Sequence, residues 1–363
     1  MLKSTFKLIR KEQMNWFKKT AGLSIVAGLT AVSGFCTETI NGAGASFPEP
    51  VYRVWTYNFQ KATGTRINYQ SVGSGAGINQ IKSKTVDFGA TDNPLKLEEL
   101  EKNGLMQFPM LMGGVVIVVN VPGVEINQLK LDGETVGNIF LGNIKNWNDQ
   151  AIAKLNPELK LPDLPVTVVH RSDSSGTTWI FTDYLAKVSA GWKKDVGCDK
   201  SVKWPVGIGG QKNPGVCNNV EKVKGSIGYV EYTYALESKL PTVMLKNCDG
   251  NFVKPEISTF QAAGANADWQ NAPAFYMELN DQPGKDSWPI TGATFILIYK
   301  NQENKAKAEA MLKYFKWCFT EGAQSATNLK YVPIPETVFN LVKSAWDKSV
   351  VADGKPVNYK SEE

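Results

Sequence analysis

The stretch GGVVIVVNV, residues 113–121, is one of the two most uniformly apolar strand-like segments of the chain, and ATFILIYK, residues 293–300, is the other. Segments of this kind predict strands that are buried on both faces. Two arrangements fit them: they carry the chain between two lobes, or they are central strands of a single sheet. We favour the crossing arrangement, because buried extended segments are natural hinges.

On either side of these strands, short strand-like segments alternate with longer helical ones. RINYQSV (66–72) precedes the helical pattern AGINQIKSKT (76–85), and VTVVHRS (166–172) precedes TTWIFTDYLAKVSAGW (177–192). This alternation predicts an α/β fold with mainly parallel sheets. A chain of 363 residues usually divides into two domains.

Residues 1–36 have the features of a cleavable signal peptide. The uncharged apolar run TAGLSIVAGLTAVSGF (20–35) follows Lys18 and Lys19 and is short for a bilayer span of about 20 residues. An uncleaved anchor is the less favoured alternative. We therefore expect the mature protein to be a soluble protein of the periplasm.

The processing site of this segment stays open at the level of the sequence. Small residues fit cleavage after Gly34 or after Cys36, and either Met1 or Met14 serves as the start. Lipid anchoring through Cys36 is less favoured, because Phe35 stands where a lipoprotein has a small residue.

The charge distribution argues against a nucleic-acid partner. Residues 1–36 hold six basic residues and one acidic residue, so they carry the whole net charge of +5, and the rest of the chain is neutral. A neutral mature chain has no basic face that would release counterions from a polyanion. Any anion must therefore be held by local geometry.

Cysteine and histidine usage argues against a metal site. The chain has five Cys without a C-x-x-C pair and a single His, His170, so we expect no metal and no cofactor. Secretion permits disulfides. The pairing of the cysteines stays open, and Cys198–Cys217 is the pair that we favour because the two flank one Gly-rich turn. Cys318, in a helical pattern, is expected to be a buried thiol.

Two Gly-rich turns precede predicted helices. GAGASFPEP (42–50) places Ser46 and Phe47 just before a helix that begins near its prolines. GSGAG (73–77) lies between a strand and a helix and has the spacing of neither a Walker loop nor a dinucleotide fingerprint. Exposed backbone N–H groups at such helix starts favour an anion.

A third turn, HRSDSSGTTWIF (170–181), concentrates hydroxyl groups where a strand ends and a helix begins. It has more Ser and Thr than one helix cap needs, and Asp173 can orient the guanidinium of Arg171. We interpret this turn as an anion-binding element rather than an ordinary cap.

Asp92, in DFGATDNP (87–94), is a fourth candidate. A carboxylate repels anions, so Asp92 belongs in an anion site only if the ligand carries a proton that it can accept. At the ordinary pKa of an aspartate it is ionised near pH 7 and acts as an acceptor.

With these motifs the chain resembles the periplasmic phosphate-binding proteins of bacterial high-affinity phosphate ABC transporters, the Pst system. The resemblance runs from about residue 41 to 359. It rests on GAGASFPEPVY, GSGAG, VDFGATD, FPMLMGGVVIVVNVPG, FLGNIKNWND, HRSDSSGTT, GSIGYVEY and WPITGATFILI.

The resemblance implies an α/β, two-lobed periplasmic-binding-protein fold of type II, with two hinge crossovers and the ligand in the interlobe cleft. Lobe one would comprise residues 37–115 and 290–363, and lobe two residues 116–289. It also implies a monomer that binds inorganic phosphate and delivers it to an inner-membrane phosphate ABC permease with a cytoplasmic ATPase. It implies no enzyme activity.

The family's phosphate contacts correspond to eight positions of this chain, with Asp173 behind the arginine. They are Ser46, Phe47, Ser74, Asp92, Arg171, Ser175, Gly176 and Thr177. Ser46 stands where many relatives have Thr, and His170 where some have a second Arg, so no direct contact is missing.

Two other function classes are less favoured by the sequence. A Ser hydrolase or phosphohydrolase needs a base beside its nucleophile. The only His precedes Arg171 on a strand and should face away from it, and no G-x-S-x-G motif occurs. Another tetrahedral oxyanion, sulfate or molybdate, remains a closer alternative, and Asp92 argues against it because a fully ionised anion offers no proton.

Overall fold

The structure, a computed structural model, describes residues 39–360, so the predicted signal peptide lies outside the described residues. Within residues 39–360 no helix combines the length and the apolar character that crossing a membrane would require.

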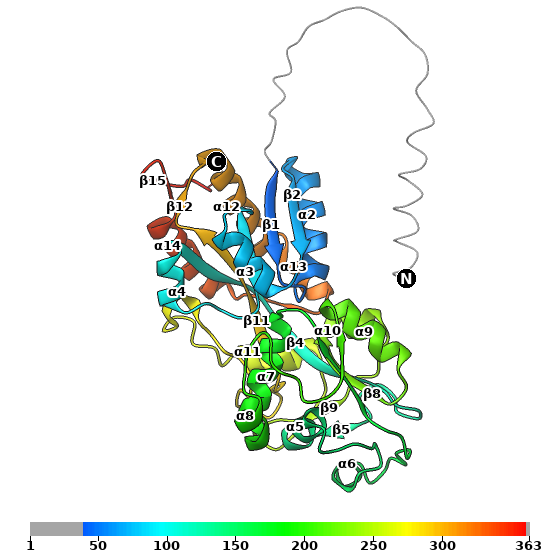
Figure 1. Cartoon of the computed structure of the whole chain (residues 1–363). Coiled ribbons are helices and arrows are strands. Elements are labelled where there is room, and N and C mark those ends of the chain that lie inside the picture. Colours follow the sequence, from blue (N-terminus) through cyan, green and yellow to red (C-terminus); the bar gives the residue numbers. More distant parts are fainter. Residues whose placement is uncertain (1–38, 361–363) are drawn as a thin grey trace, which may run out of the picture. The chain divides into compact units, whose positions relative to one another are not determined.

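A nine-stranded mixed sheet forms the centre of the fold (Figure 1). Its strands at each end are parallel, whereas the strands in its middle are antiparallel to their neighbours. The prediction of mainly parallel strands therefore holds only for the two ends. The order across the sheet is β2 (Ile67–Ser71), β1 (Ile40–Gly44), β3 (Phe88–Thr91), β11 (Thr291–Tyr299), β4 (Leu105–Asn120), β8 (Ser226–Glu231), β6 (Thr167–Arg171) and β7 (Ile208–Gly210), with β13 (Val332–Pro333) also paired to β4.

The long strand β4 changes partners along its length. Its residues 105–114 pair with β11, and its residues 115–120 pair with β8. The segment GGVVIVVNV therefore pairs with strands from both halves of the sheet. The apolar character of this segment follows from its position, because every residue of β4 except the last is buried.

The segment 293–300 does not cross in this way. It falls in β11, which pairs only with β3 and with residues 105–114 of β4, so it is a central strand and the crossing prediction is wrong for it. The chain reaches β11 through residues 288–290, which meet β4 where it changes partners. There Val115 N donates to Ile290 O at 2.8 Å and Trp288 Nε1 donates to Val115 O at 2.9 Å.

Several helices pack against the sheet. In α2 the predicted buried face is present, with Val51, Trp55 and Phe59 all buried. The helices are α2 (Glu49–Thr63), α3 (Ser74–Lys82), α4 (Leu97–Lys102), α5 (Gly133–Leu141), α6 (Gln150–Leu155), α7 (Gly176–Val188), α8 (Ala190–Asp195), α9 (Lys212–Lys222), α10 (Tyr232–Glu237), α11 (Ile257–Gly264), the 3-10 helix η2 (Pro273–Phe275), α12 (Lys305–Phe319), α13 (Ala323–Asn328) and α14 (Glu336–Ser349).

Two three-stranded sheets complete the described fold. One consists of β10 (Phe252–Val253), β9 (Met244–Lys246) and β5 (Lys130–Leu131), and the other of β12 (Asn301–Gln302), β14 (Val351–Ala352) and β15 (Lys355–Pro356).

All four cysteines in the described part of the chain are free, so the prediction of a Cys198–Cys217 disulfide is wrong. Cys217 lies on the buried face of α9. Cys198 is exposed on the loop after α8, and its thiol donates to the Trp179 carbonyl at 3.7 Å. Proximity in the sequence did not bring the two together, because α9 turns Cys217 toward the core. Cys318 is buried, as predicted.

We expect protein purified without reductant to contain free thiols at both Cys198 and Cys217. Alkylation of unfolded, unreduced protein followed by peptide mapping measures this directly, with a reduced sample as the control. A peptide pair linked through these two residues would contradict the structure.

Candidate functional site

The candidate residues lie where strands end. Ser46 and Phe47 follow β1, Asp92 follows β3, Arg171 is the last residue of β6, and Ser74 begins α3 after β2. The carboxyl ends of neighbouring parallel strands meet at one edge of a sheet, which is where open α/β folds bind ligands. The structure buries all eight predicted residues, including Ser175, Gly176 and Thr177 at the start of α7.

Backbone contacts join the loops from the two ends of the sheet. Gly75 N donates to Ser174 O at 3.1 Å. A Cβ atom on Gly176 would lie 2.5 Å from Ser74 Oγ and 2.6 Å from Asp92 Oδ2. Such distances are too short for any side chain, so only glycine allows α7 to begin this close to Asp92.

Asp92 is a buried carboxyl with one unused oxygen. Its Oδ2 accepts from Ser74 Oγ at 3.4 Å, and its backbone N–H donates to that hydroxyl at 3.3 Å. Within residues 39–360 its Oδ1 has no hydrogen-bond partner. Burial raises the pKa of Asp92 to about 7, and the Thr294 hydroxyl, the Arg171 guanidinium and Ser74 limit the rise. The expectation of an ordinary pKa is therefore wrong.

Arg171 is held by Asp173 and keeps one nitrogen unpaired. Its Nε and Nη2 donate to Asp173 Oδ1 and Oδ2 at 2.8 and 2.6 Å, as a bidentate pair. The Arg171 side chain is buried, and its Nη1 is without a partner among the described residues. Burial alone would raise the pKa of Asp173, but its bonds to Arg171 and to Lys212 N hold that pKa below the ordinary value. The predicted orienting role of Asp173 thus has a geometric basis.

His170 lies outside this group of residues. Its ring stacks on Trp204 with centroids 4.7 Å apart, and its Nδ1 faces the Arg171 carbonyl oxygen at 3.0 Å. Burial lowers its pKa below the ordinary value. The chain's single imidazole is thus engaged by Trp204 and by a backbone carbonyl.

The hydroxyl groups of the site accept hydrogen bonds from fixed protein donors. Ser175 Oγ caps α7 by accepting from Thr178 N at 3.0 Å. Ser46 Oγ and Thr177 Oγ1 accept from Asn213 Nδ2 at 3.0 and 3.4 Å. Since a hydroxyl that accepts still has its own hydrogen to give, these three groups can donate to a further acceptor.

Sequence reasoning missed Asn213, which lies in the first turn of α9. The signal that could have found it is GIGGQKN (207–213), a short Gly-containing strand followed closely by a helix. Three buried tyrosines were also missed. Tyr234 OH donates to Ser46 O, Tyr331 OH donates to Phe47 O, and Tyr229 OH accepts from Arg171 N.

The arrangement suits an anion that also carries a proton. The start of α7 and that of α3 bring positive dipole ends to the site, and Arg171 supplies a free donor. Asp92 offers the opposite, an acceptor. Among the described residues no group of three His, Cys, Asp or Glu side chains is placed to hold a metal ion.

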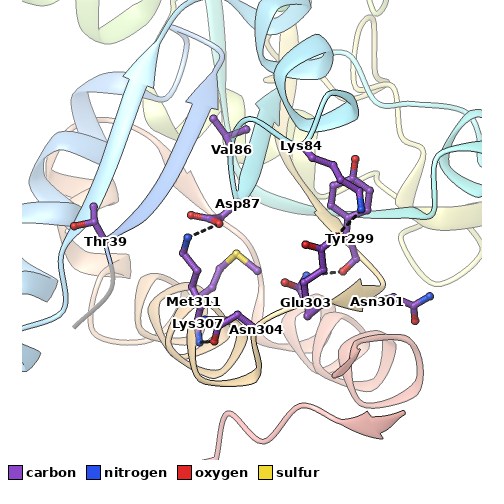
Figure 2. A pocket seen from close by; sticks show the side chains of 11 residues that line it. Thr39, Lys84, Val86, Asp87, Tyr299, Asn301, Glu303, Asn304, Lys307 and Met311 are labelled. Carbon is purple, nitrogen blue, oxygen red and sulfur yellow. Dashed lines mark hydrogen bonds and ion pairs between the residues drawn. The ribbon is translucent and has the colours of Figure 1, made fainter. Parts of the chain in front are cut away.

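A separate pocket of about 490 Å³ lies near the opposite ends of the strands (Figure 2). It is lined by Thr39, which precedes β1, and by Tyr299, the last residue of β11. The charges that face it are paired, with Lys84 Nζ 2.6 Å from Glu303 Oε1 and Lys307 Nζ 2.7 Å from Asp87 Oδ1. Figure 2 shows both pairs pointing toward one another, so this pocket offers no free charge to a ligand.

Comparison with known proteins gives consistent results. A family model described as a PBP superfamily domain matches residues 30–321. The phosphate-binding protein PstS of Pasteurella multocida is 50% identical over 88% of this chain and 93% of its own length. PstS of Haemophilus influenzae is 48% identical over 85% of this chain and 92% of its own.

Solved structures support the fold. A high affinity periplasmic phosphate-binding protein, PfluDING, solved with phosphate, superposes with a TM-score of 0.69 at 19% identity, covering 87% of this chain and 96% of that one. A putative phosphate ABC transporter substrate-binding protein from Clostridium perfringens gives 0.59 at 18%, covering 82% and 100%. Together with the sequence relatives, these matches show an α/β two-lobed periplasmic-binding-protein fold. The chain therefore belongs to the PBP superfamily and, within it, to the family of phosphate-binding proteins named PstS.

Proposed function

We propose that this protein binds inorganic phosphate in the periplasm and delivers it to an inner-membrane ABC permease, driven by a cytoplasmic ATPase, as a monomer. Relatives about half identical over most of the chain are named phosphate-binding proteins. The fold is that of substrate-binding proteins rather than of a hydrolase, and His170 is stacked on Trp204 rather than placed beside a nucleophile.

The observation that carries the proposal is a pair of buried, unpartnered atoms. Arg171 Nη1 can only donate and ionised Asp92 Oδ1 can only accept, and neither has a partner within residues 39–360. Leaving such groups unpaired costs about 1–3 kcal/mol each. Phosphate satisfies both, because it has anionic oxygens and near neutral pH keeps at least one proton.

The proposed contacts are the eight residues named from the sequence. Arg171 and the hydroxyls of Ser46, Ser175 and Thr177 donate to phosphate oxygens, and Asp92 accepts the phosphate proton. The backbone of Phe47, Ser74 and Gly176 adds N–H donors, while the Ser74 hydroxyl stays bonded to Asp92 Oδ2. The set is Ser46, Phe47, Ser74, Asp92, Arg171, Ser175, Gly176 and Thr177, with Asp173 orienting Arg171.

Titration calorimetry of ligand-free protein with phosphate, sulfate and molybdate tests this function. We expect saturable one-site binding of phosphate and much weaker binding of the other two anions. Stronger binding of sulfate or molybdate would favour the oxyanion alternative, and release of phosphate from esters would favour a phosphohydrolase. No heat with phosphate would overturn the proposal.

The lobe boundaries are part of the proposal. Lobe one comprises residues 37–115 and 290–363, and lobe two residues 116–289. The change of partner along β4 at residues 114 and 115 supports the first boundary, and the contact of Val115 with Ile290 supports the second. Phosphate, held by contacts from both lobes, stabilises the closed form through those differential contacts.

We expect Gly176→Ala to weaken phosphate binding by about 1–3 kcal/mol, the usual cost of overpacking. Its Cβ would strike Ser74 Oγ and Asp92, so the lobes could not close as tightly. Calorimetry measures the affinity, and small-angle scattering measures whether phosphate compacts the particle.

Gly191→Ala is the matched control, since a Cβ there meets only the flexible Leu141 side chain at 3.3 Å. If Gly176→Ala binds phosphate as tightly as wild type and compacts to the same extent, the close approach at this glycine does not matter for binding.

A further inference from the structure

We propose that Asn213 is a positioning residue of the phosphate site, which turns the hydroxyl hydrogens of Ser46 and Thr177 toward the ligand. The inference rests on the proposed function and adds to it a residue that does not itself touch phosphate. It follows from the direction of three hydrogen bonds.

The side chain of Asn213 lies between two loops that are far apart in the sequence. Its Nδ2 donates to Ser46 Oγ at 3.0 Å and to Thr177 Oγ1 at 3.4 Å, and the residue is fully buried. Ser46 follows β1 and Thr177 belongs to α7. One amide nitrogen therefore contacts a hydroxyl from each proposed lobe.

The orientation of this amide is determined by a backbone donor. Glu231 N donates to Asn213 Oδ1 at 3.1 Å. A backbone N–H can only donate, so the atom facing it must be the amide oxygen, and the NH₂ group must face the two hydroxyls. Glu231 is itself held in place, because its Oε1 accepts from Thr233 N at 3.0 Å and its Oε2 lies 2.8 Å from Tyr331 OH.

The consequence concerns where the hydroxyl hydrogens point. Each hydroxyl has one hydrogen and two acceptor positions. An NH₂ group only donates, so it occupies an acceptor position on each oxygen and leaves the hydrogen free. Over residues 39–360 the structure gives neither Ser46 Oγ nor Thr177 Oγ1 a protein acceptor, so both hydrogens remain for an anion.

The Ser175 hydroxyl is held in the same way, because Thr178 N donates to Ser175 Oγ and leaves the hydroxyl hydrogen free. There the donor is backbone and belongs to the same helix. At Asn213 it is a side chain from α9, and it acts on both hydroxyls at once. Replacing this one donor should therefore disturb two phosphate contacts.

Asn213→Asp tests the inference because it replaces only the side-chain NH₂ group with an oxygen. The oxygen that accepts from Glu231 N is kept, while the NH₂ becomes an oxygen that draws both hydroxyl hydrogens toward itself. We expect phosphate to bind at least about 100-fold more weakly at pH 8, since a hydrogen bond to a charged group contributes about 1.5–3 kcal/mol and two are lost.

Two backgrounds separate this effect from the added negative charge. In Ser46→Ala and in Thr177→Val one hydroxyl is absent, so the same Asn213→Asp change should cost about tenfold less in each. Such non-additivity is the measure of coupling between contacting residues. Asn218→Asp, an exposed change on the same helix, is the matched control and should leave affinity unchanged.

Calorimetry gives the affinities, and urea unfolding of ligand-free protein shows whether each variant remains folded. The inference is overturned if Asn213→Asp binds like wild type, or if its loss is undiminished in both backgrounds, which would mean that charge or packing alone explains it. Wild-type protein that binds no phosphate would instead overturn the proposed function.

Discussion

Arg171→Ala is expected to weaken phosphate binding by about 2–5 kcal/mol, the range for truncating one partner of a desolvated charge pair. Arg171 is buried and its Nη1 has no partner within the described residues, so phosphate would lose its cationic donor. Since residues 37–363 carry no net charge, they supply no general positive field that would compensate. Arg171→Lys should recover only part of the loss, because an ammonium lacks the planar fork that binds both Asp173 and phosphate.

Calorimetry of the two variants measures this loss. Arg53→Ala is the matched control: it removes the same charge from an exposed residue that pairs with Glu49 across one helical turn. An exposed pair of this kind contributes at most about 1 kcal/mol to stability. If Arg171→Ala binds phosphate within a few-fold of wild type, Arg171 is not a phosphate ligand.

The second large effect concerns selectivity and is expected for Asp92→Asn. In the proposed site, ionised Asp92 would accept the phosphate proton but would meet only negative oxygen on sulfate. The asparagine keeps the shape, removes the charge and adds a donor. Sulfate binding should therefore improve by about 1–3 kcal/mol relative to phosphate, the scale of a repaired buried polar mismatch.

The raised pKa of Asp92 gives this prediction a pH dependence. Burial raises that pKa to about 7, so the carboxyl of the free protein gains its proton as the pH falls through about 7 and can then donate to an anion. Sulfate does not titrate in this range. Wild-type affinity for sulfate should thus rise as the pH falls from about 8 to 6, and in Asp92→Asn this rise should be absent.

The same shift bears on stability in the absence of ligand. An aspartate whose pKa is raised on folding stabilises the folded state fully below its unfolded pKa, and this contribution is lost as the pH rises through about 7. The free energy of unfolding of wild type and of Asp92→Asn, measured across this pH range with exposed Asp195→Asn as the matched control, isolates the contribution of this carboxyl to stability.

The selectivity prediction has its own decisive outcome. An unchanged ratio of phosphate affinity to sulfate affinity in Asp92→Asn would show that Asp92 is not the selecting residue.

The sequence by itself determined the local structure. A strand, a short turn and a helix follow one another at the predicted loops, and the spacing of Val51, Trp55 and Phe59 predicted the buried face of α2. These features depend on backbone preferences and on periodicity over a few residues, which the sequence contains directly. The family resemblance rested on the same local motifs, and the relatives confirm it.

Only the tertiary structure decided what depends on residues far apart in the chain. The apolar runs 113–121 and 293–300 read alike, yet only the first crosses between strand partners. Cys198 and Cys217 are near in the sequence, yet a helix face turns one toward the core. The pKa of Asp92 and the role of Asn213 could not be predicted from the sequence either. Desolvation and hydrogen-bond direction are set by groups that folding brings together from distant loops, and no local pattern contains them.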